Sequence, residues 1–133
     1  MKLVADANVI ISCLIKEGKS IELLLNFGFD IYVPEFILKE ISKHKQEILD
    51  KVKRTEEEFE EALDRINSVI KIIPNEDFIE YVDEARKICP DIDDVMYFAL
   101  ALKLKSAIWS DDKKLKQQDK IRVYSTEELA RIE

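Results

Sequence analysis

Short apolar runs that alternate with longer helix-like stretches constrain this chain more than any other feature of its sequence. Strands that are separated by helices pair in parallel, and the helices then cover both faces of the sheet. The sequence therefore predicts an α/β fold, a three-layer sandwich with a central, mostly parallel sheet flanked by helices. The five predicted strands are Lys2–Ala5, Ile31–Val33, Lys71–Ile73, Ala107–Trp109 and Arg122–Tyr124.

The stretch between Pro34 and Pro74 contains neither glycine nor proline. Pro34 favours the first turn of a helix, and the Thr55–Glu58 segment has the spacing of a capping box, which predicts a second helix start. We therefore expect two long helices that form an antiparallel arm over residues 34–70. Its apolar positions at helical spacing are Val52, Phe59, Leu63, Ile66 and Ile70.

The remaining helices are predicted between the other strands. Asn75 is expected to cap a helix that ends before Pro90, and Asp94 is expected to begin a helix that is apolar almost all round. The other predicted helices cover residues 8–15, 20–26 and 112–118, and a final one begins at Ser125.

Length and charge limit the classes of protein. A chain of 133 residues fits a single domain over residues 1–133. No apolar run is long enough for a membrane span, no signal peptide is recognised, and two distant cysteines indicate a reduced, cytoplasmic protein. The net charge of −7 argues against a nucleic-acid partner, unless bound cations offset part of it at the site where the partner lands.

Carboxylates follow the predicted strands at the edge where α/β folds gather their functional groups. Asp6 comes directly after the first strand, Asp112 follows the fourth, and Asp94 begins a helix that runs back toward a strand. Each of these residues can also be read as an ordinary helix cap or turn residue. Glu40 differs, because its spacing places it on or beside the apolar face of its helix, where a carboxylate needs a partner such as a lysine, His44 or a metal ion.

Four carboxylates expected at one edge of one sheet repel one another unless cations are bound between them. A ligand set of oxygens, without cysteine or histidine, favours Mg²⁺ or Mn²⁺. Divalent ions held by carboxylates suit the hydrolysis of phosphodiester bonds. The pattern thus predicts a metal-dependent nuclease site formed by Asp6, Glu40, Asp94 and Asp112.

Over essentially its whole length the chain resembles the PIN-domain family, which includes VapC-like ribonuclease toxins. The resemblance implies a Rossmann-like sheet, endoribonuclease activity with Mg²⁺ or Mn²⁺, and an acidic metal site made of those four carboxylates. It further implies supporting roles for Asn8 and Ser110, an RNA substrate, a homodimer, and a small antitoxin partner for toxin members. The matching segments are Asp6–Asn8, Glu40–Ile41, Asp94 with Ala99–Ala101 behind it, and Ser110–Asp112.

Several alternatives stay open at this point. Asp93 or Asp111 can take the place of its neighbour as a ligand, and Lys113 and Lys114 can either hold an RNA backbone or form a solvated surface. A phosphatase with an aspartyl nucleophile is disfavoured, because the segment after Asp6 lacks a second aspartate two residues on. The competing reading is a catalytically silent PIN-like domain that acts as an RNA- or protein-binding scaffold.

Overall fold

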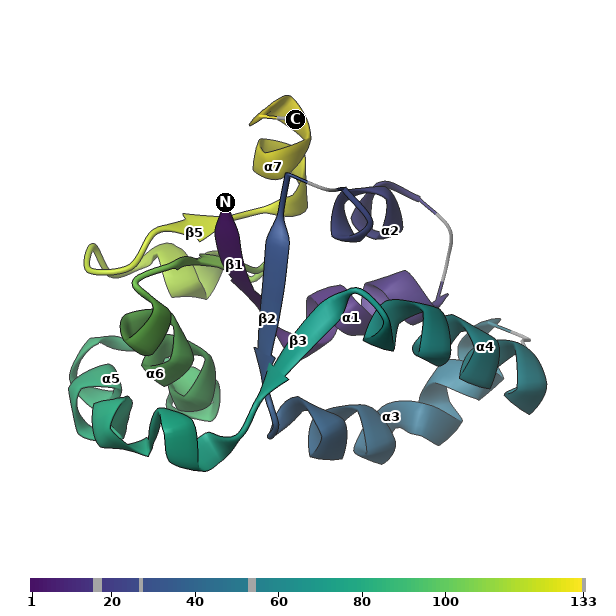
Figure 1. Ribbon diagram of the computed structural model, residues 1–133, viewed down its shortest axis with the longest axis horizontal. Coiled ribbons are helices and arrows are strands. Elements are labelled where there is room, and N and C mark those ends of the chain that lie inside the picture. The colour runs from purple at the N-terminus through teal and green to yellow at the C-terminus, as the bar shows by residue number, and fades with distance from the viewer. Residues whose placement is uncertain (16–17, 27, 53–54, 133) are drawn as a thin grey trace.

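The computed structural model describes residues 1–15, 18–26, 28–52 and 55–132, although not the side chain of Val52. Five parallel strands form one sheet in the order β3-β2-β1-β4-β5, which confirms the predicted α/β class (Figure 1). The expected sheet was mostly parallel, and the observed sheet is parallel throughout. The strands are β1 Lys2–Ala5, β2 Asp30–Pro34, β3 Ile70–Ile73, β4 Ala107–Trp109 and β5 Val123–Tyr124.

Helices cover both faces of this sheet and make the three layers visible in Figure 1. Helices α1 to α4 lie on one side of it, and α5 with α6 lies on the other. The chain crosses from the β3 edge to β4 on the far side of β1, so the strand order reverses between β1 and β4. The α-helices are α1 Ala7–Ile15, α2 Lys19–Leu24, α3 Ile37–Val52, α4 Glu56–Asn67, α5 Val82–Ile88, α6 Val95–Leu104 and α7 Thr126–Ile132.

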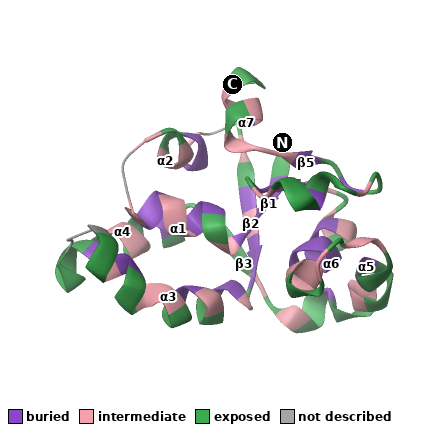
Figure 2. Ribbon diagram, turned by 180° about the vertical axis from the view of Figure 1, so that it is seen from behind, coloured by how far each residue is buried: buried purple, intermediate pink, exposed green. Residues whose placement is uncertain are grey.

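The core lies where the central strands meet α1 and α6. Leu3, Val4 and Ala5 of β1 have no exposed surface, as expected for a strand covered on both faces. Helix α6 buries its residues from Tyr97 to Ala101, so the prediction of a nearly all-apolar, buried helix is confirmed. Figure 2 shows this buried material along the sheet, with the exposed residues on the outer sides of the helices. None of the described helices is long and apolar enough to cross a membrane.

Helices α3 and α4 form the predicted pair of long helices, and the break between them is confirmed. Thr55 accepts a hydrogen bond from the backbone of Glu58, and the Glu58 carboxylate accepts one from the backbone of Thr55. Phe59 and Ile66 are buried as the helical spacing predicts. The side chain of Val52 lies outside the described residues.

Ion pairing also joins these two helices. The Lys45 ammonium group on α3 lies 3.0 Å from the Glu56 carboxylate and 3.1 Å from the Glu60 carboxylate, both on α4. Ile70, which the helical spacing assigned to the arm, belongs to β3 instead, because it pairs with Ile31 of β2.

Three predicted helices differ most from the observed ones. Pro34 ends β2, where it pairs with Ile73 of β3, and α3 begins three residues later. The predicted helix capped by Asn75 is divided into the 3-10 turns η1 Asn75–Asp77 and η2 Ile79–Tyr81, followed by α5. The segment after Asp112 forms only the 3-10 turn η4 Lys113–Lys116. In each case, hydrogen bonds to neighbouring strands or turns outweigh local helix propensity.

Candidate active site

A cavity of about 420 Å³ opens at the carboxyl edge of the sheet, beside the end of β1. It lies next to the point where the strand order reverses, the usual place for a ligand in an open α/β sheet. Three of the predicted carboxylates line it, each supplied by a different stretch of the chain: Asp6, Glu40 and Asp94. Residues far apart in the sequence thus face one common space.

Asp6 is the most buried of these acids, with 4% of its surface exposed. One carboxylate oxygen accepts a 2.9 Å hydrogen bond from the backbone of Val9 and so caps α1, and the other accepts a short hydrogen bond from the Ser110 hydroxyl. Burial raises the pKa of Asp6, and these two hydrogen bonds oppose that rise. Asp6 therefore both caps a helix and presents a carboxylate to the cavity.

Asp94 occupies the N-terminal cap position of α6, yet its side chain makes no capping hydrogen bond. The capping oxygen in this turn comes from Asp91, which accepts a 3.0 Å hydrogen bond from the backbone of Asp93. Burial raises the pKa of Asp94 to about 6, with further contributions from the charges of Asp6, Asp91, Asp112 and Asp93. Asp94 is thus a half-buried carboxylate that lacks a cap role, whereas its exposed neighbour Asp93 lies at the cavity wall.

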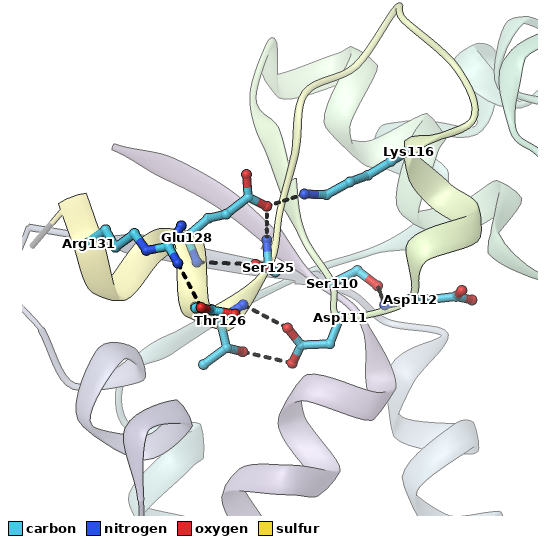
Figure 3. Close-up of polar contacts among 9 residues, drawn as sticks. Ser110, Asp111, Asp112, Lys116, Ser125, Thr126, Glu128 and Arg131 are labelled. Carbon is cyan, nitrogen blue, oxygen red and sulfur yellow. Dashed lines mark hydrogen bonds and ion pairs between the residues drawn. The ribbon is translucent and has the colours of Figure 1, made fainter.

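Asp111 and Asp112 point in different directions (Figure 3). The Asp111 carboxylate accepts 2.7 Å hydrogen bonds from both the backbone and the hydroxyl of Thr126, so it anchors the start of α7. The half-buried Asp112 accepts a 3.0 Å hydrogen bond from the backbone of Lys114, and its charge contributes to the raised pKa values of Asp6 and Asp94. Asp112 lines an adjoining cavity of about 480 Å³, on the Ser110 side.

Ser110 lines the second cavity and binds Asp6, which lines the first. The side chain of Ser110 is 1% exposed, and its hydroxyl donates to Asp6 while accepting a 3.1 Å hydrogen bond from the backbone of Asp112. Ser110 therefore holds the Asp6 carboxylate directly, and its supporting role at a metal site stays a prediction. Asn8 also lines the first cavity, but it is exposed and its side chain makes no hydrogen bond within the described part of the chain.

Glu40 and Lys43 stand on the same face of α3 and line the first cavity. Glu40 is half-buried, and neither side chain has an ion-pair or hydrogen-bond partner among the described residues. Lys43 brings a positive charge to the wall of this cavity. Lys113 and Lys114 are exposed on η4, beside Asp112.

Tyr97 is a cavity residue that the sequence analysis missed. It was read as part of an apolar helix, although it follows Asp94 by three positions and therefore shares its helix face. This spacing of three residues from Asp94 was the sequence signal that placed Tyr97 on the same helix face as the candidate ligand. Its ring packs edge-on against Phe36, with 6.3 Å between the ring centroids.

The donor set fits a hard divalent cation in its chemistry, since every candidate ligand is an oxygen. Within the described ranges, no three aspartate, glutamate, histidine or cysteine side chains are close enough together to hold a metal ion as they stand. Burial raises the pKa values of Asp6 and Asp94, and the charges of neighbouring acids add to the rise. A cation would relieve the repulsion between these charges once the side chains close around it.

The raised pKa of Asp94 predicts how the stability of the metal-free protein depends on pH. The folded protein holds the proton of this carboxyl group up to about pH 6, whereas the unfolded chain releases it near 3.8. The free energy of unfolding should therefore fall as the pH rises through that window, by about 1–2 kcal/mol after allowance for solvent screening. Urea unfolding in EDTA at a series of pH values measures this, and a rise across the window would contradict it.

The chain belongs to the PIN domain family, because the model of that family matches residues 4–129. The resemblance seen in the sequence is thereby confirmed. A search of curated proteins finds no match.

Solved structures show the same fold. One similar chain comes from the crystal structure of VapBC2 from Rickettsia felis bound to a DNA fragment from its promoter. It has a TM-score of 0.71 and 17% identity, over 94% of this chain and 98% of that one. Another is PAE2754 from Pyrobaculum aerophilum, with a TM-score of 0.64 and 14% identity, over 99% of this chain and 89% of that one.

Proposed function

We propose that this PIN domain is a divalent-metal-dependent endoribonuclease that hydrolyses RNA phosphodiester bonds. The observation that carries the proposal is the cavity into which Asp6, Glu40 and Asp94 converge from three stretches of the chain. Crowded carboxylates with raised pKa values are costly to a fold, and they are typical of a site that works with a bound cation. Membership of the PIN domain family supports this assignment.

The residues that would hold Mg²⁺ or Mn²⁺ are Asp6, Glu40, Asp94 and Asp112. A divalent ion bound by such carboxylates polarises the phosphate and makes a water molecule a better nucleophile. Ser110 and the backbone of Val9 fix the Asp6 carboxylate together. The Ser110 hydroxyl donates a hydrogen bond to one carboxylate oxygen, and the Val9 backbone donates to the other. Asn8 would contribute a further polar group at the cavity mouth.

Positive side chains around the acids would bind the RNA backbone. Lys43 lines the cavity itself, and Lys113 and Lys114 are exposed beside Asp112. These cations, together with bound metal, would offset the net charge of −7 where the substrate lands. Attack of water in line with the leaving oxygen would leave 5′-phosphate and 3′-hydroxyl ends, with Glu40 acting as a ligand or as a base toward the water.

The biological role that fits best is the toxin of a toxin–antitoxin pair, working in the cytoplasm as a homodimer. The support is the PIN domain fold together with a structural neighbour that comes from a VapBC complex. On this proposal a small antitoxin protein covers the active site and restrains cleavage. Growth arrest on expression of the chain, relieved by co-expression of the neighbouring small reading frame, would support it.

The activity is tested with a labelled, structured RNA, Mn²⁺ and purified protein. Asp6→Asn keeps the size of the side chain and an oxygen for the Val9 amide, so the fold should persist while cleavage falls at least about 100-fold. The matched control is Asp30→Asn, the same change at the exposed first residue of β2, on the opposite edge of the sheet.

EDTA should abolish cleavage by the wild-type protein and by Asp30→Asn alike. Cleavage that survives both EDTA and Asp6→Asn would mean that the proposed site does not act. Tight RNA binding without any cleavage would favour the silent scaffold, and 2′,3′-cyclic phosphate ends would overturn the proposed hydrolysis.

A further inference from the structure

The hydroxyl group of Tyr97 is the polar atom at this site that has no role in the arrangement described so far. Tyr97 is 3% exposed, and its hydroxyl donates no hydrogen bond in the described part of the chain. The backbone of Ala7 lies near enough to lower the pKa of Tyr97, but it does not reach hydrogen-bond geometry and leaves the hydroxyl proton without an acceptor. Buried hydroxyl groups almost always have a hydrogen-bond partner, and one without it costs stability. An unpaired hydroxyl in the wall of an acidic cavity therefore points to a partner that arrives with a ligand.

Packing holds the ring of Tyr97 in place, and burial keeps its hydroxyl group protonated. Phe36 packs against the ring at an interplanar angle of 73°. Burial raises the pKa of Tyr97 well above its usual value, and the nearby charges of Asp6, Glu40 and Asp94 add to the rise. A tyrosine hydroxyl donates hydrogen bonds, and this one lies near the carboxylates of Asp6, Glu40 and Asp94.

The available acceptor is Glu40. Both oxygens of Asp6 already accept a hydrogen bond, and its buried side chain is fixed by them. Glu40 is half-buried, has no partner among the described residues, and carries one more rotatable bond than an aspartate. Asp94 also makes no capping hydrogen bond, but its charge raises the pKa of Tyr97 less than the charge of Glu40 does. The carboxylate that can turn toward Tyr97 is therefore that of Glu40.

We propose that Tyr97 is a positioning residue whose hydroxyl donates a hydrogen bond to the Glu40 carboxylate and holds it over the cavity when a divalent cation binds. The inference rests on the proposed metal site and deepens it. In the described ranges, no three candidate ligand side chains lie close enough together to hold a metal ion. The proposal explains this, because Glu40 would take up its position only when the cation binds. Outer hydrogen-bond partners of this kind typically change metal affinity by roughly 10–100-fold.

The test measures Mn²⁺ binding by isothermal titration calorimetry with wild-type protein and Tyr97→Phe, which removes only the hydroxyl oxygen. We expect Tyr97→Phe to bind Mn²⁺ at least about 10-fold more weakly. Its melting temperature without metal should stay the same or rise, because the lost hydroxyl had no partner. The matched control is Tyr32→Phe, on the half-buried Tyr32 of β2, which does not line the cavity and should bind Mn²⁺ normally.

A double-mutant cycle with Glu40→Gln shows whether Tyr97 acts through Glu40. We expect Tyr97→Phe to weaken Mn²⁺ binding less than about twofold when Glu40→Gln is already present, since interacting residues are not additive. The same loss in both backgrounds would overturn the proposal. Equal Mn²⁺ affinity of the wild type and Tyr97→Phe would also overturn the role of Tyr97, but it would not contradict the nuclease proposal. Absence of Mn²⁺ binding by the wild type would instead remove both proposals.

Discussion

Asp94→Asn is expected to make the metal-free protein more stable while it reduces RNA cleavage at least about 100-fold. The pKa of Asp94 is raised to about 6 by burial and neighbouring acids, so its charge at neutral pH opposes folding. The amide removes that charge and should add about 1–2 kcal/mol to the free energy of unfolding after discounting for solvent. Urea unfolding at pH 7.5 in EDTA, which we choose to keep the group ionised, gives the stability, and single-turnover cleavage with Mn²⁺ gives the activity.

A gain in stability together with a loss of RNA cleavage distinguishes a functional carboxylate from a structural one. If Asp94 served only as a helix cap, its replacement would lower stability and leave cleavage by the folded protein unchanged. Asp30→Asn controls for the change in net charge, because its exposed side chain belongs to the far edge of the sheet. The unfolding curve of Asp94→Asn should also lose most of the pH dependence expected between pH 4 and 6.

Trp109→Ala should destabilise the protein by about 3–5 kcal/mol, the largest loss of stability we expect from a single replacement. The indole of Trp109 is fully buried at the end of β4, and its ring nitrogen donates a 3.0 Å hydrogen bond to the Thr126 hydroxyl. That hydroxyl in turn donates to Asp111, so removal of the indole disturbs the attachment of α7 as well as the core. Thermal and urea unfolding measure the effect.

Trp109→Phe is the matched control, since it keeps an aromatic ring but cannot donate to Thr126. We expect it to cost less than half as much as Trp109→Ala, because most of the buried area is retained. Equal losses for the two variants would show that the hydrogen bond to Thr126, rather than the filling of the core, accounts for the contribution of Trp109.

The arrangement of the strands could be predicted from the sequence because apolar runs and helical spacing are local signals. Val4 and Ile108, for example, lie in short apolar segments, and they pair in the sheet as those segments suggest. Boundaries were harder where tertiary hydrogen bonds decide. Asn75 has the chemistry of a helix cap, but its side-chain oxygen has no partner within the described residues, and the chain there forms short 3-10 turns.

Part of the candidate site could be predicted from the sequence, because the position of a residue directly after a strand is also a local signal. The positions of Asp6 and Asp112 after strands placed both at one edge, whereas the choice between Asp111 and Asp112 needed the position of Thr126 in space. The spacing from Asp94 indicates the helix face of Tyr97, but only the fold shows that its hydroxyl has no hydrogen-bond partner among the described residues. The ligand roles of the four acids stay predictions until binding is measured.

The single hydroxyl of Ser110 joins the ends of two neighbouring strands, since it donates to Asp6 after β1 and accepts from the backbone of Asp112 after β4. One oxygen atom thereby holds the Asp6 carboxylate beside the backbone at Asp112, while the Asp112 carboxylate itself accepts from the backbone of Lys114. If the proposed metal site forms, replacement of Ser110 should shift Asp6 relative to this loop and change which divalent ions the site prefers, although Ser110 itself need not touch the ion.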